Sequence, residues 1–404
     1  MTFFTVKNRS NILSKFEYRN VARRMVLKTT LLPLCFLFSA CSASAPQQNP
    51  FSPNQSITVT ELARFNDIPW GADFLDSDTL LVTLKSGKLA TINLETGKIH
   101  YIEGLPGVVN VGQGGLLDVA VLDTTAPDHQ TKEAPPFWIY FTYSATASNS
   151  LTTALGRAKL DKDRLVEWET LFIADTHSDA TVHFGSRIAF DDNKHLYISI
   201  GDRGARDSAQ DRSNHAGSII RLNLDGSVPK DNPFYNDLNA RAEIWSYGHR
   251  NPQGLFFDKR TQTLWSNEHG PRGGDEINKI LKGENYGWPV VSYGKEYWSF
   301  SAVGEGTQKK GMEDAKKVFI PSIAPSDLLI YHGRLFSDWN DDIISTALAL
   351  RHINRLRLNE NDDEAQQEQR YLRNLDERFR SITQAPDSSL IVTTDSGKVL
   401  RLTP

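Results

Sequence analysis

Cysteine is almost absent from this 404-residue chain, which contains only Cys35 and Cys41. Both lie near the N-terminus, so the rest of the chain has no thiol for a disulfide, although an exported protein is free to form one. No pair of cysteine and histidine residues has the spacing of a zinc site. Stability must therefore come from core packing or from a bound metal of another kind.

An excess of basic charge is also absent. The chain has 45 Lys and Arg against 49 Asp and Glu, a net charge of −4, which argues against a nucleic-acid-binding protein. Neither a Walker A motif nor a G-x-G-x-x-G motif between a strand and a helix is present, so a nucleotide cofactor is not supported. A G-x-S-x-G elbow is missing as well, although composition alone leaves a Ser–His–Asp hydrolase open.

The chain has no apolar run of membrane-spanning length. Its longest run near the N-terminus, Leu31–Phe38, is too short for a span. Basic residues precede this run and Ser39-Ala40-Cys41 follows it, a pattern typical of a secretory signal. The cysteine after small residues resembles a bacterial lipobox, with Phe38 where leucine is usual. We therefore expect cleavage before Cys41 and a lipid on Cys41 that attaches the protein to the membrane, the alternative being an ordinary signal peptide with an incidental cysteine.

These features divide the chain into three parts. Residues 1–40 are predicted to be a lipoprotein-type signal peptide. Residues 41–56 are polar and proline-rich, which is typical of a flexible tether. Residues 57–404 are predicted to be the folded domain. We expect the protein to be exported and to face the periplasm, attached to the outer membrane of a Gram-negative bacterium.

A loose repeat runs through the folded domain. Each copy has an apolar strand, a turn with Asp, Gly or Ser, and a second strand that alternates Leu or Ile with a basic residue. The copies are 74–97, 137–161, 190–226, 257–281, 335–359 and 385–402. A spacing of roughly 60 residues suits four-stranded blades, so we predict an all-β fold, a six-bladed β-propeller of antiparallel blades. The segment 57–64 is expected to complete the last blade beside 398–402. A pair of β-sandwiches is the alternative, and 362–378 is expected to be either a helix or a charged loop.

Polar loops are unusually dense in residues 183–289, and loops positioned by strands are where binding chemistry is usually found. His183 precedes a strand and is a candidate general base, or else a surface histidine. Gly270-Pro271 with Asp275-Glu276 offers carbonyl and carboxylate oxygens, which suit Ca²⁺ better than a transition metal. The alternative for this loop is a turn with a solvated acidic pair.

Arginines and aromatic residues suggest a flat, anionic ligand. Arg250 beside Asn251 has the donors for a carboxylate. Arg378 and Arg380 alternate, so on a strand they face one side and favour an anion between them, unless the strand is a solvated edge. Tyr286 and Trp288 have rings that could stack on a ligand or pack within a blade.

Together these motifs resemble those of a known family, the soluble aldose sugar dehydrogenases that depend on pyrroloquinoline quinone (PQQ) and are related to soluble quinoprotein glucose dehydrogenase. The resemblance extends from GQGGLLDVA (112–120) to DERFRSITQAPD (376–387) and is most specific in GSIIRLNLDGSVPKDNPF, GHRNPQGL, EHGPRGGDEIN and GENYGWP. The family is a six-bladed propeller with PQQ and Ca²⁺ in a cleft at one face. The resemblance thus implies a six-bladed propeller, which is also the fold that the repeat predicts.

The resemblance also implies roles for individual residues. His183 matches the general base, and Gly270 and Pro271 match the residues whose carbonyls hold the active-site Ca²⁺. The implied PQQ-binding residues are Gln113, Arg250, Asn251, Arg378 and Arg380. Asp275, Glu276 and Tyr286 match the region of a second, structural calcium site.

The sequence departs from the family pattern at two places. Ala349 aligns with a position where the family often has a PQQ-binding lysine, and Arg351 is a possible substitute. His269 stands where glutamine is common before the Gly-Pro pair.

The implied reaction is hydride transfer from the anomeric carbon of an aldose to PQQ, with a lactone as product and an unidentified electron acceptor reoxidising the cofactor. Two other functions remain open at this point: a non-enzymatic propeller that binds a sugar or a protein, and a Ca²⁺-dependent lactonase.

Overall fold

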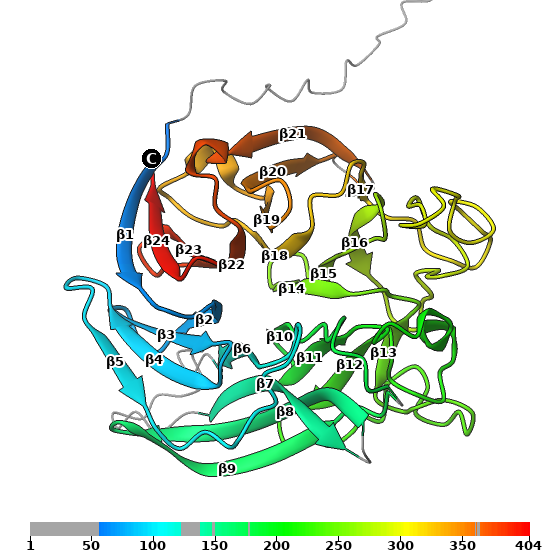
Figure 1. Ribbon diagram of the computed structural model, residues 1–404, viewed down its shortest axis with the longest axis horizontal. Helices are drawn as coiled ribbons and strands as arrows, with labels where there is room; N and C mark the ends of the chain where they lie inside the picture. The colour runs from blue at the N-terminus through cyan, green and yellow to red at the C-terminus, as the bar shows by residue number, and fades with distance from the viewer. Residues whose placement is uncertain (1–55, 123–137, 148–149, 177, 360, 362–363) are drawn as a thin grey trace, which may run out of the picture. The chain divides into compact units, whose positions relative to one another are not determined.

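The computed structural model describes residues 56–404 apart from 123–137, 148–149, 177, 360 and 362–363. The strands of this part form six four-stranded antiparallel sheets, arranged as blades around a common axis (Figure 1). The predicted six-bladed propeller is confirmed. The predicted signal peptide, Cys41 and nearly all of the tether lie outside the described residues, so export and lipid attachment stay predictions. No described helix is long and apolar enough to cross a membrane.

Each blade is a meander of four strands. The first three blades are β2 (Pro69–Phe74), β3 (Thr79–Leu84), β4 (Lys88–Asn93) and β5 (Ile99–Ile102); β6 (Leu116–Val121), β7 (Trp138–Ala147), β8 (Ser150–Asp161) and β9 (Arg164–Ile173); and β10 (Ile188–Phe190), β11 (His195–Ile200), β12 (Ser218–Asn223) and β13 (Ile244–Tyr247). The next two are β14 (Pro252–Asp258), β15 (Thr263–Glu268), β16 (Asp275–Ile280) and β17 (Lys317–Phe319); and β18 (Pro325–Ile330), β19 (Ile343–Ala347), β20 (His352–Leu358) and β21 (Ala365–Tyr371).

The sixth blade joins the two ends of the domain. It contains β22 (Phe379–Gln384), β23 (Leu390–Thr394), β24 (Lys398–Thr403) and, from the start of the domain, β1 (Thr58–Arg64). β1 pairs antiparallel with β24, with Val59 opposite Leu402 and Arg64 opposite Lys398. The predicted closure of the ring is confirmed, and it covers a sheet edge that would otherwise be exposed.

The repeat in the sequence corresponds to the two middle strands of each blade. Copy 74–97 contains β3 and β4, copy 190–226 contains β11 and β12, and copy 385–402 contains β23 and β24. These strands have neighbours on both sides and are the most regular parts of each blade. The first and last strands of each blade adjoin loops and contain polar residues, so they contribute little to the repeat pattern.

One expectation for the fold is wrong. The segment 362–378 is neither a helix nor only a loop, because residues 365–371 form β21 and a short 3₁₀ turn covers Arg373–Leu375. β21 is the outermost strand of its blade and pairs with β20, which places Glu368 opposite Leu356. An outer strand borders solvent along one edge, so charged residues are tolerated there and imitate the pattern of a charged helix.

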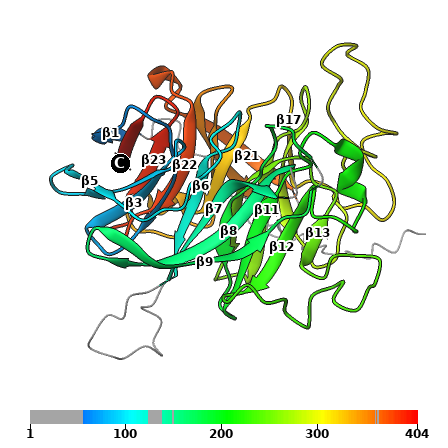
Figure 2. The same cartoon turned by 60° about the horizontal axis from the view of Figure 1, so that its bottom comes forward.

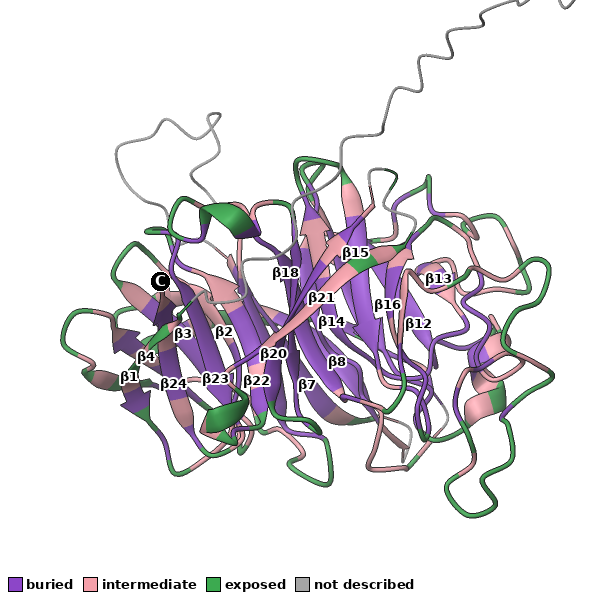
Figure 3. Cartoon of the chain, turned by 90° about the horizontal axis from the view of Figure 1, so that it is seen from above, coloured by how far each residue is buried: buried purple, intermediate pink, exposed green. Residues whose placement is uncertain are grey.

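Burial follows position within the blade. All residues of β19 and β23 are buried, since adjacent blades cover both of their faces, whereas half of the residues of β9 are exposed. Figure 3 colours each residue of the blades by its burial. Aromatic residues fill the spaces between blades. Between the fifth and sixth blades, Trp339 and Phe336 pack in one cluster with Phe379 and Leu390. The long connection between β16 and β17 extends away from the blades (Figure 2).

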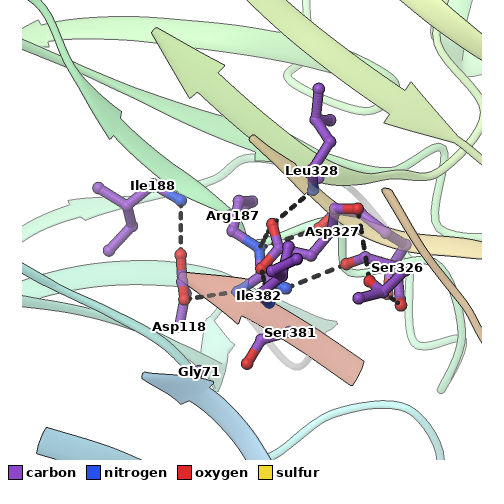
Figure 4. Close-up of polar contacts among 12 residues, drawn as sticks. Gly71, Asp118, Arg187, Ile188, Ser326, Asp327, Leu328, Ser381 and Ile382 are labelled. Carbon is purple, nitrogen blue, oxygen red and sulfur yellow. Dashed lines mark hydrogen bonds and ion pairs between the residues drawn. The ribbon is translucent and has the colours of Figure 1, made fainter. Parts of the chain in front are cut away.

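A buried polar cluster lies on the innermost strands (Figure 4). Arg187 donates from Nη1 to Asp118 Oδ1 (2.8 Å), and its Nε lies 3.3 Å from Asp327 Oδ1. Asp118 also accepts the backbone N–H of Ile188, and Asp327 accepts that of Ile382. These contacts link the second, third, fifth and sixth blades.

Candidate active site

A cavity lies at the rim where the first strand of each blade begins and the second ends. The antiparallel pairing places these ends together, as Pro69 lies opposite Leu84 and Pro252 opposite Glu268. The cavity has a volume of about 250 Å³. Its lining residues come from all six blades and their connections: Ile68, Trp70, Lys85, Gly112, Gln113, Leu117, Phe184, Gly185, Gln253, His269, Ala324, Leu348, Arg378 and Arg380.

The charged side chains that line this cavity are all basic. Lys85, Arg378 and Arg380 line it, and no Asp or Glu does. Trp70 and Phe184 supply aromatic walls. A flat ligand that carries carboxylates fits such a lining, because aromatic faces stack on it and the cations balance its charge. Of the predicted PQQ-binding residues, Gln113, Arg378 and Arg380 lie in this lining.

His183 is held beside this cavity by both its backbone and its ring. Its N–H donates to Gln113 Oε1 (2.7 Å), and its neighbour Phe184 lines the cavity. The backbone of His183 has φ +56°, which is uncommon for a residue other than glycine. Gly201, at the end of β11, permits this conformation, because a Cβ on Gly201 would lie 2.2 Å from the His183 carbonyl oxygen.

Asp202 orients the imidazole ring. Its Oδ1 lies 2.6 Å from His183 Nδ1, and its Oδ2 accepts the indole N–H of Trp288 (2.7 Å). Burial alone would raise the pKa of Asp202, but the hydrogen bond and charge of His183, together with the charge of Arg250, lower it overall. An ionised Asp202 requires the proton of His183 on Nδ1, so Nε2 is left as a proton acceptor. The sequence reasoning missed Asp202, whose only signal is its position in GDRG after a strand.

Arg250 and Asn251 lie between β13 and β14, where Arg250 donates to the carbonyl of His269 (3.1 Å). Asn251 accepts the N–H of Gly185 (3.2 Å), so it contacts the loop of the predicted base. Arg250 Nε and Asn251 Nδ2 are buried without a hydrogen-bond partner in the described part of the chain. Buried donors of this kind are expected where a ligand supplies the acceptor.

Asp395 organises the arginine pair. It accepts from Nε of Arg378 (2.8 Å) and from Nε of Arg380 (2.9 Å). Burial is the main cause that lowers the pKa of Arg380, and the charge of Arg378 adds to it. The one carboxylate holds both side chains in place but balances only one of their charges.

Gly270 and Pro271 lie on a tight loop between β15 and β16. The Asp275 carboxylate accepts the N–H groups of Gly270 (2.9 Å), Ile323 (2.7 Å) and Ala324 (2.7 Å), so it fixes this loop against the start of the fifth blade. A Cβ at Gly270 would lie 2.2 Å from the carbonyl oxygen of Gly274, so only glycine fits there. The predicted metal ligand Asp275 thus has a structural role in the loop.

Glu276 and Tyr286 belong to a second, smaller cavity of about 20 Å³ that also contains Arg250, Glu268, His269 and Gly270. Glu268 lies directly opposite Glu276 on paired strands. Burial raises the pKa of Glu276, and the neighbouring charge of Glu268 raises it further. Two adjacent carboxylates in one small cavity favour a bound cation. Glu268 was missed, because its position opposite Glu276 follows from strand register.

His269 lines both cavities and therefore connects the predicted PQQ and metal regions. Burial lowers its pKa to about 3, with the charge of Arg250 as the next cause, so the ring is neutral. Its Nε2 is another buried atom without a partner among the described residues.

The predicted substitute for the missing lysine lies elsewhere. Arg351 is exposed and pairs with Asp376 (2.6 Å), and neither Arg351 nor Ala349 lines the cavity. Lys85, which follows β3 in the first blade, does line it. A single lysine in a turn carries no recognisable sequence signal, and the sequence reasoning missed it.

The comparisons with known proteins agree with this geometry. The chain is 35% identical over 381 residues to the aldose sugar dehydrogenase YliI of Escherichia coli, covering 93% of this chain and 98% of that protein. The apo crystal structure of the soluble aldose sugar dehydrogenase from Escherichia coli has a TM-score of 0.79 at 34% identity and covers 86% of this chain and 100% of that one. The PQQ-bound aldose sugar dehydrogenase of Streptomyces coelicolor has a TM-score of 0.69 at 26% identity, covering 87% and 99%. The family model for Glucose / Sorbosone dehydrogenase matches residues 66–401, and the chain belongs to this family.

Proposed function

We propose that this chain is a PQQ- and Ca²⁺-dependent dehydrogenase that oxidises aldose sugars at the anomeric carbon to lactones. The observation that carries the proposal is a cavity lined by three basic residues and no acidic one, with the His183–Asp202 pair beside it. The membership in a family of sugar dehydrogenases, and the PQQ named for the relative from Streptomyces coelicolor, support it.

The residues of the chain fit this cofactor. Its carboxylates match the basic side chains Arg378 and Arg380, which line the larger cavity. Arg250 lines the smaller cavity and Asn251 lines neither, but each has a buried donor without a partner among the described residues, which suits an acceptor on the cofactor. Gln113 orients the loop of His183 at the same site. When bound, PQQ would supply the hydride acceptor, and the carbonyls of Gly270 and Pro271 would hold a Ca²⁺ that polarises it.

His183 performs the proton transfer. As a hydride leaves the anomeric carbon, Nε2 of His183 takes the proton of the anomeric hydroxyl, and the C–O bond becomes the lactone carbonyl. Asp202 stabilises the imidazolium that forms and holds the ring in position. The side chain of His183 is 15% exposed, which leaves it accessible to a sugar.

A second calcium ion is proposed at Glu276, with Glu268 opposite and Tyr286 on the wall of the same cavity. Asp275 acts from outside this cavity by fixing the loop that carries Gly270.

The deciding experiment is a titration of purified apoprotein with PQQ, with and without Ca²⁺, followed by dye reduction with a panel of aldoses. Tryptophan fluorescence reports binding, because Trp70 lines the cavity. We expect saturable quenching, and dye reduction that requires both PQQ and Ca²⁺ and is abolished by a chelator. Lactone hydrolysis without PQQ would instead indicate a lactonase. Sugar or protein binding with no PQQ binding would indicate a non-enzymatic propeller.

A further inference from the structure

Lys85 occupies a fixed position at the edge of the large cavity. Its backbone N–H donates to the carbonyl of Ile68 (2.9 Å), and its own carbonyl accepts the N–H of Leu116 (3.1 Å), the first residue of the second blade. Gly115 packs against it so closely that a Cβ there would lie 2.1 Å from the Lys85 carbonyl oxygen. The turn after β3 is therefore held between two blades, and the lysine stem begins from a rigid backbone.

The Lys85 ammonium has hydrogen-bonding capacity to spare. Its Nζ donates to Oδ1 of the exposed Asn110 (2.9 Å). An ammonium group has three donors, so this contact holds the side chain in place and leaves donors for a ligand. Lys85 forms no ion pair within 4.0 Å in the described part of the chain.

The charges around Lys85 favour an anion. Burial is the main cause that lowers its pKa, Asp67 opposes this effect, and Arg380 lowers the pKa further. Asp395 is committed to the two arginines, and the carboxylate of Asp67 accepts the N–H groups of Ile68 and Ser86. Neither carboxylate lines the cavity, whereas all three cations do. A ligand carboxylate between Lys85 and Arg380 would relieve their mutual repulsion.

The fifth blade lacks the lysine that the resemblance implies, whereas Lys85 of the first blade lines the cavity. The resemblance implies a PQQ-binding lysine at the position of Ala349, which is exposed in this chain, and Arg351 there pairs with Asp376 instead. We propose that Lys85, from the first blade, supplies the ammonium group that binds a carboxylate of the cofactor in this chain, in place of the lysine of the fifth blade. This inference rests on the proposed function.

The test compares PQQ affinities of apoproteins by fluorescence titration in the presence of Ca²⁺. Lys85→Met should weaken binding about ten- to hundredfold, the range expected for a charged hydrogen bond, and Lys85→Arg should restore most of it. Lys88→Met, which removes an exposed lysine of the same blade, is the matched control and should bind like the wild type. Arg351→Met tests the competing residue. Thermal unfolding of each variant establishes that it is folded.

A second measurement does not depend on a variant. PQQ should protect Lys85, but not Lys88, from an amine-reactive reagent when the modified lysines are mapped by mass spectrometry. Wild-type affinity of Lys85→Met, or loss of affinity in Arg351→Met alone, would overturn the role of Lys85 while leaving the proposed function intact. If the wild-type apoprotein itself bound no PQQ, the proposed function would fail, and the role of Lys85 with it.

Discussion

At the residue scale, the site depends on a few side chains whose positions are fixed by unusual local structure. His183 has a left-handed backbone, and Gly201 is required beneath it. One carboxylate oxygen of Asp202 lies beside Nδ1 of His183, and the other accepts the indole N–H of Trp288. A carboxylate held from both sides leaves the imidazole a single orientation, which a general base requires.

We expect His183→Ala to bind PQQ normally but to lose about 10²–10⁴-fold in turnover, because the general base is removed. Asp202→Asn should lose on the order of tenfold or more, since an amide supports the wrong tautomer of the imidazole. Steady-state kinetics with one aldose, alongside the PQQ affinity of each apoprotein, separates turnover from binding. Trp288→Phe keeps an aromatic ring but removes the N–H that is donated to Asp202. Its turnover should fall less than that of Asp202→Asn. Near-normal turnover of His183→Ala would exclude the proton-transfer role.

At the element scale, β15 and β16 form the hairpin on which the metal proposal depends. Their register places Glu268 directly opposite Glu276, and like charges in this position destabilise a sheet. The loop that joins these strands carries Gly270 and Pro271 and is fixed by Asp275. The hairpin therefore combines two adjacent carboxylates with a rigid loop of carbonyl oxygens, and a hard cation would stabilise both.

Calcium should raise the melting temperature of the apoprotein, because a ligand that binds only the folded state stabilises it, by about 2.7 kcal/mol at a hundredfold excess over Kd. In Glu276→Gln this Ca²⁺-dependent increase should be much reduced. Without metal, the same variant should be at least as stable as the wild type, since the repulsion from Glu268 is gone. Calorimetry in chelator and in Ca²⁺ checks both statements, and Glu243→Gln, on the third blade, serves as the control. An equal Ca²⁺ response in both variants would argue against a metal at Glu276.

At the scale of the whole molecule, the blades are joined by the buried cluster around Arg187. This side chain contacts Asp118 and Asp327, donates to the carbonyl of Gln253, and lies 4.5 Å above the Trp70 ring. Trp70 and Gln253 line the cavity, so the cluster also supports the site. One guanidinium balances two buried carboxylates. Burial raises the pKa of Asp327 to about 7, although Arg187 opposes the increase.

Replacement of Arg187 by Met should destabilise the protein by about 3–5 kcal/mol, because it leaves buried carboxylates without a partner. Asp327 titrates near pH 7 in the folded state and near its ordinary value of 3.8 in the unfolded state. The folded state therefore binds more protons between these values, and the contribution of Asp327 to stability falls as the pH rises through this window. Because Arg187 opposes the increase in the pKa of Asp327, its removal raises this pKa further, so the loss of stability in Arg187→Met should be larger at pH 8 than at pH 5. Urea unfolding at both values measures it.

Arg64→Met is the comparison for this experiment, because its exposed pair with Glu61 is screened by solvent and should contribute little to stability. A cost for Arg187→Met as small as that of Arg64→Met would contradict the role of the cluster.

Much of the fold and part of the site followed from the sequence. The recurring pairs of apolar strands predicted six blades, because the middle strands of each blade are largely buried and cannot vary freely. The order of the motifs identified the family, and Gln113, Arg378 and Arg380 line one cavity as that order implied. The outer strand β21 was misread, since its solvent-facing edge places no constraint on polarity.

Only the tertiary structure decided which residues from distant parts of the chain meet. Asp202, Glu268 and Lys85 carry no local signal, because a lone acid after a strand or a lone lysine in a turn is common in any β-protein. Their importance comes from strand register, which places Glu268 opposite Glu276, and from ring closure, which brings Lys85 of the first blade to the cavity of Arg380 in the sixth. The sequence determines the local periodicity of each strand, whereas the contacts between residues of different strands and blades depend on the packing of all six blades around one axis.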